Sequence, residues 1–362
     1  FQFAMSLVFI LGVVIVTKQY KYALNYDLGF QKKNIIEIPL QQVNIDLLRT
    51  ELERLPDVES ISMSSSAPGG WSNSSSWVRL TPESDSVEVS QLFTDSHFLD
   101  CLEIELIAGK NFLKEPEQNR DFVIVNETFT QEFGFATPID AVGQSVVIHK
   151  DEYVTIVGVV KDFNHQPLRE KINPFFFRYD TDRFLLANVK ISSNDIVKTL
   201  FGIEKVWETV SPESRFDFYF LDDKVEQSLI GLLTLIKIFG FLAMLAIVIS
   251  CLGLLAVVLS VSEGRIKEMG LRKVMGASSF NLAYTLSRGF IKLIGIAILI
   301  ATPFTYFLFE KVILRLQHYR SAIGIGDVLL GITILLVLLV ITIGGQTMKV
   351  ARVNPVETLK SE

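Results

Sequence analysis

Four long apolar runs divide the chain, and a long polar block separates the first run from the other three. The runs cover residues 1–17, 238–260, 293–309 and 328–343. A helix of about 20 apolar residues crosses a hydrocarbon core of about 30 Å, whereas a core helix of a soluble protein is rarely apolar on every side. The pattern therefore predicts four membrane-spanning helices, with residues 19–228 forming a domain between the first and the second.

The first run admits two interpretations. A secretory signal peptide has a basic start and a cleavage site of small residues, and residues 1–17 have neither. We interpret this run as a membrane helix with a truncated start, so the chain is expected to be a fragment of something longer.

The polar block alternates between strand and helix patterns. Short segments rich in β-branched residues predict strands, and a Ser/Gly-rich stretch over 64–76 predicts an exposed loop. A strand–helix–strand order occurs at both ends of the block, and strands dominate its middle. The predicted strands are 34–39, 58–62, 77–80, 87–92, 123–126, 145–149, 153–160, 185–191 and 216–221, and the predicted helices are 45–55, 128–133 and 194–210.

The fold class predicted is therefore a membrane α-helical protein with four transmembrane helices and a large α+β extracytoplasmic domain inserted between helices one and two. Charge gives the orientation. The short segments after the second and the fourth run carry seven Lys and Arg, against three between the third and the fourth. Cytoplasmic loops hold the excess of basic residues, so the polar block is expected outside.

Charge also separates the polar block from the rest of the chain. Residues 19–228 hold 20 Lys and Arg against 34 Asp and Glu, and the remainder holds 14 against 6. Basic residues beside apolar runs are typical of membrane flanks. A nucleic-acid-binding protein has a clustered basic face on a soluble domain, and no such cluster is present, so no nucleic-acid partner is expected.

The polar block offers few residues for catalysis. Its histidines lack metal-ligand spacing, and the chain has no nucleophile elbow, zinc-protease motif or P-loop. Asp162 and His165 could form a base, but a polar turn after a strand is the simpler interpretation. Cys101 and Cys251 lie in the polar block and in an apolar run, so no disulfide is expected between them. We predict no catalytic, metal-binding or cofactor-binding residues.

Residues 262–281 combine basic and apolar side chains, with acid-first pairs at i,i+4 between Glu263 and Lys267 and between Glu268 and Arg272. Gly270 and Gly276 are expected to interrupt a helix there. Two interpretations remain open from the spacing: a basic loop lying on lipid headgroups, or a helix that docks into a partner's groove.

The same segment resembles the FtsX-like permeases of the MacB type. Residues 263–278 read EGRIKEMGLRKVMGAS, similar to the family pattern E-R-x-K-E-I-G-I-R-K-V-x-G-A, although Gly264 stands where that family usually has Arg. Three more segments match in chain order: DLGF at 27–30, IVGVVKDFN at 156–164, and ARVNPVETL at 351–359.

The resemblance implies a permease subunit of an ABC transporter that is not itself an enzyme. In that family a separate or fused ATPase docks on the segment after the second span, and ATP-driven motion reaches the extracytoplasmic domain, which exports or extracts peptides, lipoproteins or lipids. By matched position, the ATPase-coupling residues implied here are Arg265, Lys267, Glu268, Met269, Leu271, Arg272 and Lys273.

The resemblance also implies partners and a location. The partners are an ABC ATPase subunit, a second permease half or copy in a dimer, membrane lipids, and a periplasmic or outer-membrane protein as a further option; no cofactor is implied. The location is the bacterial inner membrane, as a multi-pass protein. Some relatives carry two permease halves in one chain, and the abrupt start at Phe1 would suit the second half of such a chain.

Together these patterns predict eight segments. They are the first transmembrane helix with its truncated start (1–18), the extracytoplasmic α+β MacB-like domain (19–228), the second transmembrane helix (229–261), the cytoplasmic coupling segment (262–282), the third transmembrane helix (283–309), an extracytoplasmic loop (310–326), the fourth transmembrane helix (327–346) and a cytoplasmic tail (347–362).

Two other functions compete with the permease. One is a membrane-anchored sensor or scaffold with a ligand-binding extracytoplasmic domain, and the other is a membrane-tethered enzyme. The missing catalytic motifs argue against the enzyme. Whether residues 262–282 bind a P-loop ATPase separates the permease from the sensor.

Overall fold

The structure is a computed structural model. It describes residues 1–41, 43–69, 74–113, 119–148, 152–192, 195–274 and 279–351, without side chains for 254–255, 257–288, 290–291, 316 and 342–351. The chain divides into two compact units. The helical unit consists of Phe1–Leu24 and Ile230–Glu362, and the head consists of Asn25–Leu229.

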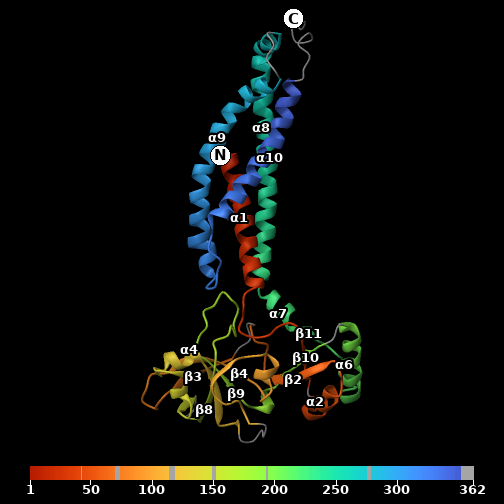
Figure 1. Cartoon of the computed structure of the whole chain (residues 1–362), viewed down its shortest axis with the longest axis vertical. Coiled ribbons are helices and arrows are strands. Elements are labelled where there is room, and N and C mark those ends of the chain that lie inside the picture. Colours follow the sequence, from red (N-terminus) through yellow and green to blue (C-terminus); the bar gives the residue numbers. More distant parts are fainter. Residues whose placement is uncertain are drawn as a thin grey trace. The chain divides into compact units, whose positions relative to one another are not determined.

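Four long helices build the helical unit: α1 (Gln2–Leu24), α8 (Ile230–Val274), α9 (Ser279–Leu308) and α10 (Ile325–Ala351). Helix α1 packs against the other three (Figure 1). Among the described residues, three segments are long and apolar enough to cross a membrane, and a shorter apolar segment lies in α10. They are Gln2–Leu24, Ile230–Gly253 and Lys292–Ile313, with Ile325–Ile341 as the shorter one.

Small residues and one polar cluster hold α1 in the helical unit. A Cβ at Gly331 would collide with a methyl carbon of Leu11, so α1 and α10 touch closely there. Near the end of α1, Lys18 forms an ion pair with Asp327 at 2.7 Å. Beside it, the buried Gln19 side chain accepts a hydrogen bond from the Ser321 N–H over 2.8 Å. The last turns of α1 are thus bonded to the segment that leads into α10.

The two ends of the head form one four-stranded antiparallel sheet in the order β11-β1-β10-β2. The elements are β1 (Ile35–Pro39), α2 (Ile45–Glu53), β2 (Val58–Ser64), β10 (Leu186–Ile191), α6 (Ile196–Val210), β11 (Tyr219–Phe220) and α7 (Leu221–Gln227). The predicted strand–helix–strand order at both ends of the block is therefore present. Strands of the first motif, β1-α2-β2, alternate in the sheet with strands of the second motif, β10-α6-β11.

Helices α2 and α6 supply the apolar face that buries one side of this sheet. Leu48 and Leu52 of α2 and Trp207 of α6 are almost completely buried and pack with the alternate strand residues Ile36 and Ile38. Helix α2 begins where Asn44 caps it, since the Asn44 side chain accepts the Leu47 N–H over 3.0 Å.

The middle of the head forms a seven-stranded sheet in the order β5-β8-β6-β9-β4-β3-β7. An additional β7–β8 pairing joins the sheet to itself, so the six strands from β8 to β7 close into a barrel around an apolar core. Its elements are β3 (Ser74–Arg79), β4 (Val87–Phe93), α3 (Phe98–Cys101), β5 (Leu106–Gly109), β6 (Phe122–Asn126), α4 (Glu127–Glu132), α5 (Pro138–Ala141), β7 (Ser145–Ile148), β8 (Glu152–Val160) and β9 (Phe175–Arg178).

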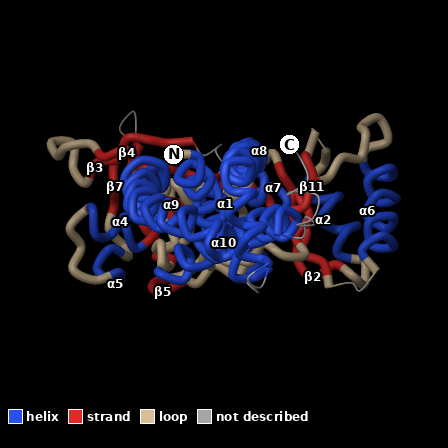
Figure 2. The backbone as a smooth tube through the Cα atoms, turned by 90° about the horizontal axis from the view of Figure 1, so that it is seen from above, coloured by secondary structure: helices blue, strands red, loops and turns tan. Residues whose placement is uncertain are grey.

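Within the head, the two sheets lie side by side, with α2 and α6 at one end and α4 and α5 at the other (Figure 2). The structure corrects several expected boundaries. Strand β3 begins at Ser74, inside the loop predicted over 64–76, because Ser74 and Ser75 pair with Gln91 and Ser90 of β4. Helix α1 continues to Leu24, six residues beyond its predicted end.

Candidate functional site

The seven residues predicted to contact an ATPase lie in the C-terminal part of α8. The helix continues without a break to Val274, so the expected interruption at Gly270 is wrong. Their side chains lie outside the described residues, as do Gly276 and residues 352–359 of the matched tail. The seven residues are Arg265, Lys267, Glu268, Met269, Leu271, Arg272 and Lys273.

Two other matched segments come together inside the head. The Asn164 N–H donates to the Leu28 carbonyl oxygen over 2.7 Å. The rings of Phe30 and Phe163 meet edge to face, with centroids 6.4 Å apart. We call residues 25–34 the entry segment, because they follow α1 along the chain. These contacts fix the entry segment to the C-terminal end of β8.

Gly29 permits this close approach. Its φ of +79° lies in the left-handed region, and the Asp27 carboxylate accepts its N–H over 3.0 Å. A Cβ at this position would lie 2.9 Å from the Cβ of Phe163 and 3.1 Å from the Asp162 carbonyl oxygen. Any side chain would thus meet both backbone strain and a collision, which accounts for glycine in the matched DLGF segment.

Asp162, in the matched KDFN segment, fixes the end of β8 to helix α4. Its carboxylate accepts hydrogen bonds from the Thr128 N–H over 3.0 Å and from the Thr128 hydroxyl over 2.7 Å. Its own N–H donates to Glu127 Oε2 over 3.0 Å. The carboxylate is occupied by structural bonds, so it is not placed as a base for His165.

An open polar groove of about 500 Å³ lies beside the entry segment. Its acidic side chains are partly neutralised, since Glu105 pairs with Lys161 at 3.0 Å and Glu103 pairs with Lys190 at 2.8 Å. Within the part of the chain that the structure describes, no three His, Cys, Asp or Glu side chains gather as metal ligands would.

Helix α7, the last element of the head before α8, is held by a buried charge. Glu37, in the middle of β1, is fully buried, and its Oε2 lies 2.5 Å from the Nζ of Lys224 on α7. Burial raises the pKa of Glu37, and the Lys224 ammonium opposes this rise. The same ammonium lies 4.9 Å from the centre of the Tyr219 ring.

The entry segment also faces α7 through charge. Burial lowers the pKa of Lys32 in the entry segment, and the carboxylates of Asp222 and Glu226 on α7 oppose this shift. The two segments that connect the head to the helical unit therefore act on each other inside the head.

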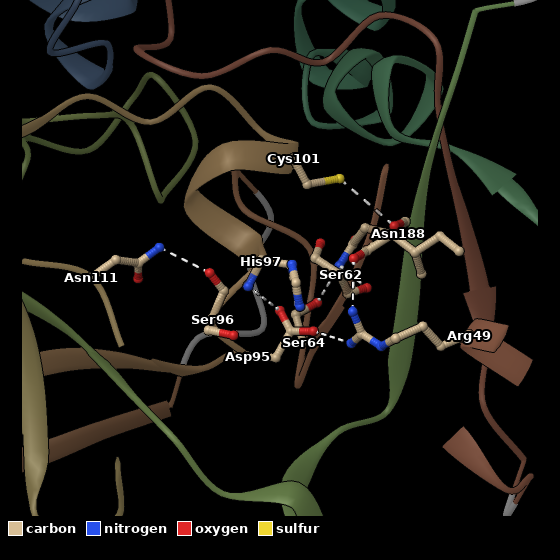
Figure 3. Close-up of polar contacts among 10 residues, drawn as sticks. Arg49, Ser62, Ser64, Asp95, Ser96, His97, Cys101, Asn111 and Asn188 are labelled. Atoms are coloured by element: carbon tan, nitrogen blue, oxygen red, sulfur yellow. Dashed lines mark hydrogen bonds and ion pairs between the residues drawn. The ribbon is translucent and has the colours of Figure 1, made fainter. Parts of the chain in front are cut away.

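A buried polar cluster joins the two sheets of the head (Figure 3). Arg49 of α2 forms an ion pair with Asp95, which follows β4, and donates to the Ile61 carbonyl oxygen over 3.2 Å. Burial raises the pKa of Asp95, and the Arg49 guanidinium opposes the rise. Asn188 of β10 donates to the Ser64 hydroxyl over 3.0 Å.

Cys101 and His165 are both buried, and each lies against a polar group of the head. Burial raises the pKa of the Cys101 thiol, which donates to the Asn188 carbonyl oxygen over 3.7 Å (Figure 3). Burial lowers the pKa of His165 to about 4, and its Nε2 lies 2.6 Å from Asn173 Oδ1. His165 is therefore a neutral side chain of a polar turn, as the simpler interpretation of the sequence held.

Sequence reasoning missed Glu37 and Lys224. The stretch 34–39 was predicted as a strand, and a lone Glu in such a strand usually points to solvent. The apolar residues on both sides of Glu37 were a signal that it is buried, because a strand that is buried on both faces has few polar positions. The partner at position 224 lies far along the chain and could not be paired with Glu37 by spacing.

Comparison with known proteins relates the chain to one family. The MacB-like periplasmic core domain family matches residues 4–196, which is more than half of the chain. No curated protein matches the chain.

Solved structures similar to this chain include two extracytoplasmic domains. The periplasmic region of MacB from Actinobacillus actinomycetemcomitans has 13% sequence identity and a TM-score of 0.40, over 56% of this chain and 94% of that one. The extracellular domain of the noncanonic ABC-type transporter YknZ from Gram-positive bacteria has 12% identity and a TM-score of 0.38, over 51% of this chain and 98% of that one.

Proposed function

Because the chain belongs to the MacB-like periplasmic core domain family, we propose that it is the permease subunit of an ABC transporter. The observation that carries the proposal is the family match, which begins inside the apolar helix α1 and continues to the start of α6. In the same chain, α8 and α9 hold segments that are long and apolar enough to cross a membrane.

In this proposal the protein spans the bacterial inner membrane four times, through α1, α8, α9 and α10. The head is inserted between the first and the second span and lies on the extracytoplasmic side. The excess of basic residues in the C-terminal part of α8 and around the C-terminal end of α10 supports this orientation. Two copies, or two permease halves, pair so that two ATPases can be engaged.

The proposed task is mechanical. A partner ATPase binds residues 262–282, and its ATP-driven motion passes through α1 and α8 to the head, which exports or extracts a peptide, lipoprotein or lipid. The attachments of the entry segment and of α7 support this task, because motion can pass only through a segment that is fixed at its far end. Gly29 and Lys224 make those attachments.

The seven matched residues of α8 are the proposed contacts with the ATPase. Basic and acidic residues of this segment would pair with charges at the rim of the ATPase groove, and Met269 and Leu271 would enter it. Because Glu268 and Arg272 stand at i,i+4, reversing both charges keeps the pairing within the helix. Such a change therefore disturbs the partner more than the helix.

The test is co-purification of the chain with candidate ABC ATPases, followed by measurement of ATP hydrolysis. The variant carries Glu268→Lys with Arg272→Glu. A matched control exchanges two exposed charges on α6, Lys205→Glu with Glu208→Lys, which lie in the head. We expect the α8 variant to lose the ATPase and the α6 control to retain it.

Two results contradict the proposal. One is that no candidate ATPase co-purifies with the wild-type chain, and the other is that both charge exchanges behave like the wild type. The membrane-anchored sensor or scaffold then becomes the better account, and the next experiment is a search for proteins bound to residues 262–282.

A further inference from the structure

A groove of about 490 Å³ opens in the head beside α7. Residues 65–68, after β2, form one wall, Leu185 and Leu186 at the start of β10 form another, and α7 contributes Lys224 and Val225. Leu185 exposes 62% of its surface, so the groove is lined in part by a solvent-exposed apolar side chain. The volume lies in the range of small-ligand sites, about 300–1,000 Å³.

Lys224 gives this groove its chemistry. Among the described residues that line the groove, it is the charged one. Its side chain keeps 30% of its surface exposed while its Nζ contacts Glu37. An ammonium has three N–H donors, and this one lies 2.5 Å from Glu37 Oε2 and 4.9 Å from the centre of the Tyr219 ring. A donor remains for a second anion that enters from the groove.

We propose that this groove binds a single-chain amphiphile with an anionic headgroup, which pairs with Lys224 while its chain covers Leu185, Leu186 and Val225. Binding itself needs no ATPase. That the head handles such an amphiphile as the substrate of a transporter, however, rests on the proposed function. The moderate volume favours one chain over the two chains of a membrane phospholipid.

The bound anion and Glu37 would share one ammonium, so the site is coupled to a proton. Glu37 is fully buried and its pKa is already raised by burial, so it is the group that takes up the proton when the second anion arrives. The groups that face Glu37 are Lys224 of α7, Tyr219 opposite it on β11 and the neutral Asn188 opposite it on β10. The remaining charges of α7 are Asp222, Asp223 and Glu226.

The experiment uses the full chain in nanodiscs of phosphatidylcholine and a dodecanesulfonate probe that carries a photoreactive diazirine. The sulfonate stays ionised throughout, so any pH dependence belongs to the protein. After irradiation, labelled peptides are identified by mass spectrometry. We expect labels on residues 65–68, 185–186 and 224–228, with affinity rising by up to about tenfold for each unit that the pH falls toward the pKa of Glu37.

Three variants and one control probe sharpen the result. Glu37→Gln removes the competing charge, so it should bind the sulfonate more tightly than the wild type near neutral pH, and without pH dependence. Glu37→Gln with Lys224→Met should lose the label, while unchanged tryptophan fluorescence shows that the head has folded. Leu185→Asp changes an exposed side chain, so it should fold and weaken labelling. Dodecanol with the same diazirine should label weakly.

Labels confined to α1, α8, α9 and α10 overturn the proposal, since they report partition into the bilayer. Equal labelling by sulfonate and alcohol also overturns it, because Lys224 would then play no part. Competition by phosphatidylglycerol in the nanodisc, without competition by free dodecanesulfonate, overturns the assignment to a single-chain ligand. Each result is read without any ATPase, so a failure here is separate from a failure to find that partner.

Discussion

The entry segment and helix α7 attach to the same head by different physical means. The entry segment is held by a backbone hydrogen bond from Asn164, by a glycine in the left-handed region and by the rings of Phe30 and Phe163. Helix α7 is held by the buried ion pair of Glu37 and Lys224. The bonds of the entry segment to β8 depend on shape, whereas α7 adds an ion pair to the burial of Leu221 and Val225.

This difference determines what can release each attachment. Packed rings and a left-handed glycine respond weakly to pH or salt, and they yield only when the chain is displaced. A buried ion pair is costly to form and strongly destabilising when one partner is lost, so a proton or a competing anion can release it. The head therefore has one fixed attachment and one that solution conditions can change. The predictions below follow in order of expected effect.

Gly29→Ala should have the largest effect on stability. Alanine is strained at the positive φ of this position, and its Cβ would also collide with Phe163 and with the backbone of Asp162. We expect a loss of about 3 kcal/mol in the free energy of unfolding of the head. For a domain of this size that lowers Tm by roughly 10 °C. All three tryptophans, at 71, 77 and 207, lie in the head, so thermal unfolding followed by tryptophan fluorescence reports on this unit.

Gly134→Ala is the matched control for that substitution. Gly134 also has a positive φ, of +76°, but nothing lies within 4 Å of its Cβ position. Only the backbone strain remains, at about 1 kcal/mol. Equal effects at both glycines would show that the close contact between the entry segment and β8 contributes nothing.

Lys224→Met should rank second, because it leaves the Glu37 carboxylate buried without its partner. We expect a loss of about 2–3 kcal/mol near neutral pH, below the usual range for buried pairs since Lys224 is partly exposed. Adding Glu37→Gln should recover most of the loss. The measurement is the same fluorescence transition, and a double variant as unstable as the single one would contradict the ion-pair account.

The pH dependence of Lys224→Met sharpens the comparison further. The pKa of Glu37 is raised in the folded head, so its protonated form favours folding, and that contribution is lost as pH rises through the folded-state pKa. Without the Lys224 ammonium, the pKa of Glu37 in the folded head rises further. Lowering the pH should therefore bring the variant toward the wild type, whereas Gly29→Ala should keep the same deficit at every pH.

Asp162→Ala should have a moderate effect on the entry-segment side. The Thr128 N–H and hydroxyl lose their acceptor, which costs about 1–2 kcal/mol for partly buried donors. Asp162→Asn should restore part of the stability, because its amide oxygen can accept one of the two bonds. If both substitutions left the Tm unchanged, the bonds to α4 would not support the end of β8.

Local patterns predicted most of the head's elements, but few of its pairings. The strand–helix–strand units at both ends were predictable because Asn44 caps a helix and β-branched segments flank it. The interleaving of those units in one sheet and the β7–β8 closure were not, since pairing between strands is decided by packing over long sequence separations. The short strand β9, Phe175–Arg178, was missed because three consecutive phenylalanines show no alternation.

The candidate site was predictable only in part. The segments 27–30 and 156–164 were singled out by resemblance, but nothing in either one indicates that Leu28 and Asn164 share a hydrogen bond. Glu37 would read as a solvent-facing residue of a strand, and its burial appears only when β10, β11 and α7 surround it. Motifs thus located the first attachment, and the three-dimensional structure was needed for the second.

Lys161→Met should have the smallest effect, although Lys161 belongs to the matched KDFN segment. It pairs with Glu105 at 3.0 Å, and both side chains expose more than half of their surface. The hydrogen bond and charge of Glu105 raise the pKa of Lys161. Any contribution of this ion pair to the stability of the head is therefore fully present at neutral pH and is lost only as pH rises through that raised pKa.

Water and salt screen such a pair. We expect no measurable change in Tm at low or high salt. A loss as large as that of Lys224→Met would mean that charge holds the entry segment too, and the contrast between the two attachments would then disappear.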